Sequence, residues 1–157
     1  MPALLILAQS ATDALTVAAM QRMGAAIHAS PIVVAIPADI EAVQGARVVR
    51  VKRDGAPITA LRIGMAQLTN TTATSVLLWP LAAAEVAMPT LLALLDAAER
   101  APGVITALSD VPIDRSPLVV PRDAWLELVT LGEGGLDALT TRRRTVRVDG
   151  ASGRETS

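Results

Sequence analysis

The segment from Ser75 to Leu95 constrains the fold most, because it contains a strand, a loop and a helix in direct succession. Its aliphatic run ends at Trp79-Pro80-Leu81 and predicts a buried strand. Pro89 suits the first turn of the helix that follows. In parallel α/β sheets, the loop after the carboxyl end of a strand commonly carries the reactive groups. Here that loop carries the alanines 82–84, so the segment predicts an enzyme-like scaffold without chemistry at this position.

Short aliphatic runs alternate with helical patterns along the rest of the chain. This alternation predicts a three-layer α/β/α, Rossmann-like sandwich with a mostly parallel sheet. We expect one domain over residues 1–149 and a disordered tail over 150–157. Prolines bound the run 118–120, so an edge or irregular strand is expected there. Strands are expected at 3–8, 31–37, 46–51, 76–81, 104–108, 118–120 and 145–148, helices near 13–27, 58–68, 89–100, 122–131 and 136–143, and one helical turn at 39–44.

Composition excludes several classes of function. The chain has 157 residues, a net charge of −1 and no cysteine. The charge argues against nucleic-acid binding, and the lack of cysteine excludes disulfides, a thiol nucleophile and a thiolate metal site. No apolar run reaches the ~18 residues of a membrane span, so we expect a cytoplasmic protein. The mean hydropathy of +0.46 favours a homo-oligomer or a complex with a protein partner.

Three segments resemble the MobA-type nucleotidyltransferases, the guanylyl- and cytidylyltransferases of the molybdenum cofactor. Ile58–Leu68 is similar to the family's S-L-R-x-G-L helix, with Arg62 and Gly64 close to the pattern and Ala60 at the serine. Residues 76–95 are similar to LLLWPVDHPLVTPETLRALL. Residues 116–131 are similar to GHPVLFPRxLWxEL, with Ser116 at the histidine. The resemblance implies a Rossmann-like fold and metal-assisted transfer of a nucleotidyl group from CTP or GTP to molybdopterin.

The chain departs from that family where its chemistry lies. The family has a glycine-rich loop, AGGxSxRMGxxK, after its first strand, where backbone N–H groups reach phosphates. Here Gln9 and Ser10 follow that strand, without glycine. The string QRMG at 21–24 comes more than ten residues later, and we interpret it as a helix end, the alternative being a displaced phosphate loop. Ala82 stands at the family's metal aspartate, and Lys52 is the only lysine.

The remaining candidates have both a functional and a structural interpretation. Arg62 and Asp110 are the catalytic candidates, and Glu85 and Asp149 are the candidates for binding metal. The structural alternatives are a solvated helix-entry charge for Glu85, a loop cap for Asp110 and a turn residue for Asp149. His28 is expected at a helix end, in a structural role. Cofactor binding is assigned to Gln9, Ser10, Arg62 and Gly64, and the arginines 142–144 are expected either to end a helix or to bind phosphate.

Two hypotheses for function follow. The first is a degenerate, catalytically inactive or impaired nucleotidyltransferase-like protein that acts as a binding or partner module, with a nucleotide or molybdopterin as the class of ligand. The second is an active transferase with relocated ligands, which would need Mg²⁺ and an NTP. The absent glycine loop, metal aspartate and phosphate lysine favour the first hypothesis. Either one leaves a link to molybdenum cofactor maturation as an expectation from the resemblance.

Overall fold

One mixed sheet organises the molecule. The computed structural model describes residues 2–41, 44–131, 135–149 and 155–156. The strands follow the order β3-β2-β1-β4-β6-β5-β7-β8. Only the pairings of β6 and β8 are antiparallel, so the expected mostly parallel sheet is confirmed. The strands are β1 (Ala3–Leu7), β2 (Ile32–Ile36), β3 (Arg47–Arg50), β4 (Ser75–Pro80), β5 (Ile105–Leu108), β6 (Leu118–Pro121), β7 (Thr145–Val148) and β8 (Glu155–Thr156).

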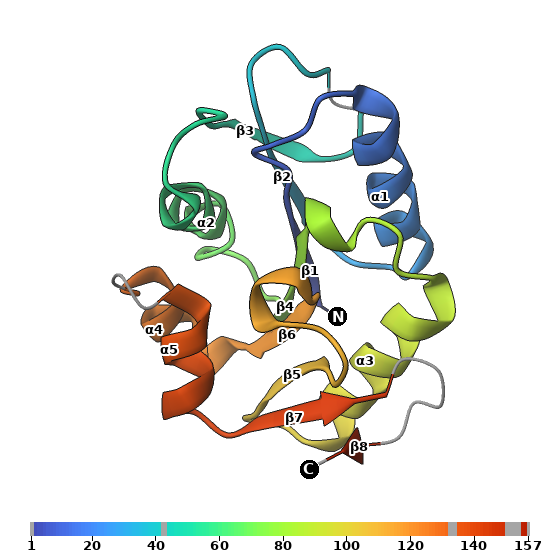
Figure 1. Cartoon of the computed structure of the whole chain (residues 1–157), viewed down its shortest axis with the longest axis vertical. Coiled ribbons are helices and arrows are strands. Elements are labelled where there is room, and N and C mark those ends of the chain that lie inside the picture. Colours follow the sequence, from blue (N-terminus) through green and yellow to red (C-terminus); the bar gives the residue numbers. More distant parts are fainter. Residues whose placement is uncertain (1, 42–43, 132–134, 150–154, 157) are drawn as a thin grey trace.

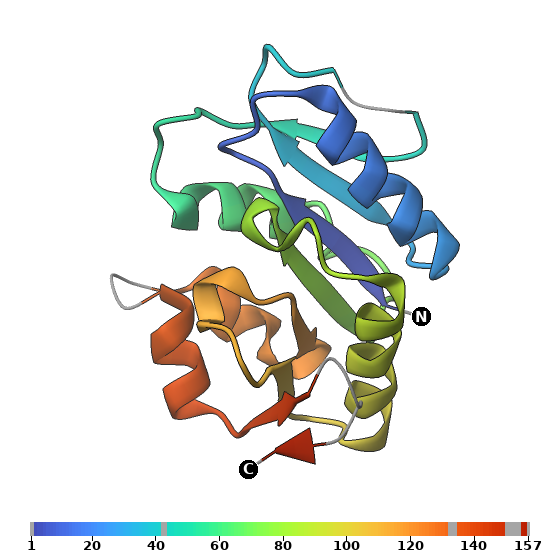
Figure 2. The ribbon, with the colours of Figure 1, turned by 45° about the vertical axis from the view of Figure 1, so that its right-hand side comes forward.

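Helices cover both faces of this sheet and make two separate hydrophobic cores. Helices α1 and α3 pack on one face, and α2, α4 and α5 pack on the other (Figure 1). Figure 2 shows α1 and α3 along the same face from a second direction. The three-layer sandwich is therefore confirmed. The helices are α1 (Ala14–Ala26), α2 (Pro57–Ala66), α3 (Met88–Arg100), α4 (Trp125–Val129) and α5 (Gly135–Arg142), with 3₁₀ turns η1 (Leu81–Ala83), η2 (Ile113–Arg115) and η3 (Arg122–Ala124).

Two helical glycines allow α1 and α2 to lie close to β1. A Cβ atom at Gly24 of α1 would lie 2.2 Å from Leu4 Cδ2. A Cβ atom at Gly64 of α2 would lie 2.5 Å from Leu5 Cδ1. Successive side chains of a strand point to opposite faces, so Leu4 and Leu5 meet the two helices on the two sides of the sheet. The central strand is thereby clamped by helix backbones on both faces.

The prediction that 118–120 forms an edge or irregular strand is wrong. Strand β6 lies inside the sheet and pairs antiparallel with both β4 and β5. Its prolines cause no conflict, because Pro117 precedes the strand and Pro121 is its last residue. The backbone N–H groups of residues 118–120 remain available for the ladder, which a proline inside the strand would prevent.

Three local expectations also differ from the structure. The described part of 39–44 contains turns rather than a helical turn, and residues 42–43 lie outside the described residues. The expected helix 122–131 is divided into η3 and α4. Within the expected disordered tail, Glu155 and Thr156 pair with β7 as the strand β8, whereas residues 150–154 and 157 lie outside the described residues.

Seven of the described arginine side chains connect loops and helix ends through hydrogen bonds. Each one donates from its guanidinium group to at least one backbone carbonyl of a loop or helix end, and we call these seven residues the arginine clamps. Because carbonyls outside regular structure need partners when water is excluded, the clamps stabilise connections that the sheet does not. The arginine clamps are Arg47, Arg50, Arg53, Arg62, Arg122, Arg143 and Arg147.

Arg122 is the clamp whose guanidinium donates to three backbone carbonyls. Its Nη1 atom donates to the carbonyls of Thr71 and, at 2.9 Å, Ala73, and its Nη2 atom donates to Thr69 at 2.9 Å. Its guanidinium carbon also lies 4.6 Å from the centroid of the Trp125 ring. The polar connection 69–74 is thus held against η3 and α4. None of the described helices is long and apolar enough to cross a membrane.

Candidate ligand-binding site

A cavity lies at the carboxyl ends of β1 and β4. The chain leaves β1 for β2 on one side, whereas β4 lies on the other side of β1. This reversal is the topological switch point, where α/β sheets open a crevice for ligands. The cavity has a volume of about 600 Å³. It is lined by Leu7, Gln9 and Ser10 after β1, by Leu78, Pro80, Leu81 and Ala82 at the end of β4, and by residues of the 53–61, 113–118 and 135–137 segments.

The loop after β1 is fastened by side chains to the turn that precedes α2. The Gln9 side chain donates from Nε2 to the carbonyl of Gly55 and, at 3.3 Å, to the carbonyl of Arg53. The Arg53 guanidinium donates back to the carbonyl of Ala11 at 2.7 Å and contacts the Asp39 carboxylate at 3.0 Å. The amide of Gln9 and the charge of Arg53 are therefore engaged within the protein.

The amino terminus of α1 carries its own anion. Asp13 is the N-cap residue, and its Oδ1 atom accepts a hydrogen bond from the backbone N–H of Thr16 at 2.9 Å. Its Oδ2 atom accepts a longer one, 3.4 Å, from the Thr16 hydroxyl. The backbone hydrogen bond is the main cause that lowers the pKa of the Asp13 carboxyl. A helix amino terminus in this position is where dinucleotide-binding folds place phosphate, and here a carboxylate already fills that role.

The loop after β4 is ordered by a side chain of the strand itself. The buried Trp79 donates from its indole Nε1 to the carbonyl of Ala83 at 2.8 Å. This contact closes the turn η1 and leaves Ala82 exposed at the cavity. A methyl group cannot bind a metal ion. The described residues also contain no group of three or more histidine, aspartate or glutamate side chains able to hold one, so no preformed site for Mg²⁺ lies beside Ala82.

Arg62 and Gly64 lie on α2, away from the lining of the cavity. Arg62 donates to the carbonyls of Val129, at 3.0 Å, and Leu131, and so caps the end of α4. Gly64 faces Leu5 of β1. The structure thus gives both residues packing contacts. Of the residues expected to bind a cofactor, Gln9 and Ser10 line the cavity.

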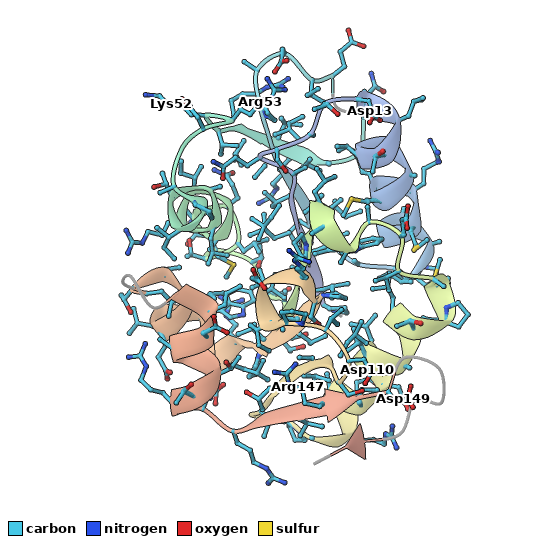
Figure 3. The ribbon with its side chains drawn as sticks, in the orientation of Figure 1. Asp13, Lys52, Arg53, Asp110, Arg147 and Asp149 are labelled. Carbon is cyan, nitrogen blue, oxygen red and sulfur yellow. The ribbon has the colours of Figure 1, made fainter. Side chains whose placement is uncertain are left out.

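Two of the expected acidic candidates, Asp110 and Asp149, are brought close to each other, but the three do not form one site. Glu85 lies in the exposed turn between η1 and α3. Asp110 and Asp149 follow the neighbouring parallel strands β5 and β7, where Ser109 N lies 2.9 Å from Val148 O. Figure 3 shows Asp110, Asp149 and Arg147 near one another, far from Asp13 and Lys52. Glu85, Asp110 and Asp149 form no metal-binding group among the described residues.

The other singled-out residues have structural surroundings. Residues 21–24 lie inside α1, and Gly24 packs against Leu4, as the helical interpretation of QRMG requires. His28 is exposed and follows the end of α1 with a φ of 62°. Ser116 is buried, and its hydroxyl accepts from the Leu108 backbone N–H and donates to the Pro117 carbonyl. Arg142 and Arg143 lie at the end of α5, and Arg143 contacts Glu127 and Asp123.

The sequence did not single out the charged residues that line the cavity. These are Asp54 before α2, Asp114 in η2, Asp137 in α5 and Arg53. They come from separate places in the chain, and each one has an ordinary loop or helix context in the sequence. Only the folding of η2 and α5 beside the β1–β4 crevice brings them together, so no local motif could have identified them.

The molecule has a Rossmann-like α/β fold that it shares with solved structures of known proteins. No protein-family model and no curated protein matches the chain, and solved structures supply the likeness. Rv0371c from Mycobacterium tuberculosis H37Rv, in complex with manganese, is 20% identical, with a TM-score of 0.70 over 94% of this chain and 88% of that chain. The 2-C-methyl-D-erythritol 4-phosphate cytidylyltransferase from Thermus thermophilus is 17% identical, with a TM-score of 0.61 over 99% of this chain and 92% of that chain. At these identities the likeness is one of fold.

Proposed function

We propose that the chain is a degenerate nucleotidyltransferase-like protein, catalytically inactive or impaired, that serves as a binding or partner module. The observation that carries the proposal is the Asp13 carboxylate at the amino terminus of α1. It takes the hydrogen bond and the favourable end of the helix dipole that a phosphate would use. A triphosphate brought to this loop would meet a negative charge and no free glycine backbone.

Other contacts support the same proposal. Gln9 and Arg53 tie the loop after β1 to its neighbours, and these donors would have to be released to reach a phosphate. Ala82 presents a methyl group where the resemblance places a metal aspartate. These are separate losses of phosphate binding and metal binding, so a single substitution would not reverse them.

The wider role is proposed from the sequence resemblance. The three segments similar to MobA-type proteins suggest a part in molybdenum cofactor maturation, with a nucleotide or molybdopterin as the class of ligand. The exposed side chains of Leu15 and Leu126, which are 81% and 74% accessible, are compatible with a homo-oligomer or a protein partner. We retain both as parts of the proposal.

A second candidate is an active NTP:molybdopterin nucleotidyltransferase that uses CTP or GTP and relocated metal ligands. The manganese complex of Rv0371c favours it, because a protein of similar fold binds a divalent metal. In this chain Asp110 and Asp149 follow the carboxyl ends of the neighbouring parallel strands β5 and β7. Two carboxylates can bind a divalent cation when substrate phosphates complete its coordination.

Calorimetry with CTP and with GTP, each with Mg²⁺ and with Mn²⁺, separates the two candidates. The degenerate protein should show no metal-dependent binding of either nucleotide in the micromolar range and should release no pyrophosphate with molybdopterin. An Asp110→Asn/Asp149→Asn double variant is the matched control. Micromolar, metal-dependent binding that this variant abolishes would establish the second candidate and overturn the first.

A further inference from the structure

The cavity at the switch point has an apolar body. Aliphatic side chains approach it from both sides of the β1–β4 crevice, and a cavity of about 600 Å³ has the size of a site for a small organic molecule. Such cavities bind through apolar contact, while a few polar groups at the edge select among ligands. The apolar residues of the lining are Leu7, Pro57, Ile58, Ala60, Leu61, Leu78, Pro80, Leu81, Ala82, Ile113, Leu118 and Leu136.

The charged groups of the lining are mostly negative. Asp54, Asp114 and Asp137 contribute carboxylates from three separate segments, namely the turn before α2, η2 and α5. All three are exposed, and no hydrogen bond or ion pair among the described residues engages their carboxylates. Arg53 is the one basic residue of the described lining, and its guanidinium is already paired with Asp39 and the Ala11 carbonyl. The cavity therefore presents unpaired negative charge around an apolar interior.

This distribution opposes the ligands of an ordinary nucleotidyltransferase. A triphosphate would face three carboxylates without a free cation of the described lining to offset them. The carboxylates are not a metal site either, because the described residues hold no metal-binding group of three. A positively charged group on an apolar body would instead gain from the same field, since charges interact strongly beside a low-dielectric wall.

We infer that this cavity binds a small apolar molecule that carries a cationic group, such as an organic amine, with Asp114 and Asp137 selecting for its charge. The inference rests on the proposed function, because a working phosphate site would require the opposite charge. It assigns the site a ligand class that differs from the nucleotides of the fold.

Three probes with one apolar body test the selection: 3-phenylpropylamine, 3-phenylpropanol and 3-phenylpropionate. Amide chemical shifts of the full chain are titrated with each probe. The amine should bind at least about tenfold more tightly than the carboxylate, as expected for two or three unit charges at short range, with the alcohol between them. The shifts should map to residues 9–10, 54–61, 80–82 and 113–118.

Two variants test whether Asp114 and Asp137 cause the preference for the amine. Asp114→Asn/Asp137→Asn should bring the ratio of amine to carboxylate affinity close to one while leaving the alcohol affinity unchanged, which also shows that the variant folds. Glu99→Gln is the control, because Glu99 lines a second cavity, of about 880 Å³, near the amino ends of β1 and β4. It should leave the ratio unaltered.

The outcomes distinguish the inference from the proposed function. Equal or tighter binding of the carboxylate, shifts at the second cavity, or an unchanged ratio in the double aspartate variant would overturn the inference. If CTP with Mn²⁺ also fails to bind, the proposed function stands without it. If CTP with Mn²⁺ binds and displaces the amine, the proposed function fails and the inference fails with it.

Discussion

Asp13 and Thr16 are joined twice at the start of α1, through the Thr16 backbone N–H at 2.9 Å and the Thr16 hydroxyl at 3.4 Å. The first contact satisfies one of the four N–H groups that a helix leaves without a partner. Both contacts also keep the Asp13 carboxylate at the positive end of the helix dipole. The same residue thus stabilises α1 and places a negative charge at its amino terminus.

Replacing the cap should separate these two roles. Asp13→Ala removes both contacts and should lower the Tm, measured by calorimetry at pH 7. Asp13→Ser keeps a side-chain oxygen that can accept from the same N–H and should retain most of the Tm. A Tm of the alanine variant equal to that of the wild type would contradict the capping role.

The stability that Asp13 contributes should depend on pH in the acid range. Its pKa is lowered in the folded protein, so the contribution is fully present above the ordinary carboxyl pKa of about 4 and is lost as the pH falls through the folded value. The Tm difference between the wild type and Asp13→Ala should therefore narrow below about pH 4. A difference that stays constant from neutral pH into the acid range below the folded pKa would argue against the carboxylate as its source.

Gly64→Ala should destabilise the protein through Leu5. Alanine gains about 1 kcal/mol of helix propensity, but its Cβ would lie 2.5 Å from Leu5 Cδ1, and overpacking costs about 1–3 kcal/mol. We expect a net loss of up to about 2 kcal/mol in urea unfolding. The double variant with Leu5→Val should recover part of it. Additive effects of the two substitutions would show that the helix and strand do not meet there.

Arg122→Met should lower the free energy of unfolding by about 2–4 kcal/mol, because three loop carbonyls lose their charged hydrogen-bond donor. Arg122→Lys should recover less than half, since an ammonium cannot reproduce the planar fork or its contact with Trp125. Arg100→Met is the control, because the exposed ion pair of Arg100 with Asp96 contributes about 0.5 kcal/mol or less. The free energies are measured by denaturant unfolding. If Arg122→Met and Arg100→Met lower the free energy of unfolding equally, the carbonyl contacts of Arg122 do not stabilise the loop.

Ala82→Asp should not create a metal-dependent enzyme. One added carboxylate does not supply the several oxygen ligands that Mg²⁺ or Mn²⁺ requires, and the aspartates already in the lining form no metal-binding group of three among the described residues. Manganese titration followed by electron paramagnetic resonance should show no micromolar site in this variant or in the control Ala84→Asp. A tight site specific to Ala82→Asp would contradict the combined loss of metal and phosphate binding.

The sequence predicted those features that depend on local pattern. The strand that ends at Trp79-Pro80-Leu81 and the helix that begins near Pro89 are visible in a few neighbouring residues. Strand β6 was misjudged because local prolines say nothing about whether partners lie on one or both sides. The partner strands are set by tertiary packing.

The cavity was less predictable than the fold. Its position at the end of β4 follows from the strand–loop–helix pattern, but Asp114 and Asp137 reach it from η2 and α5, which come much later in the chain. Gly64 matched a family motif, whereas its contact with Leu5 is visible only once α2 packs on β1. The charge of the cavity depends on residues that are distant in the chain and are brought together by folding. Such residues have no fixed spacing that a sequence motif could reveal.

The arginine clamps also limit how independently the loops can move. A guanidinium is a rigid planar fork with five N–H donors, so one clamp can fix several carbonyls relative to one another. Arg122 holds the carbonyls of Thr69, Thr71 and Ala73 in this way. The motion of one of these loop residues is therefore coupled to the motion of the other two.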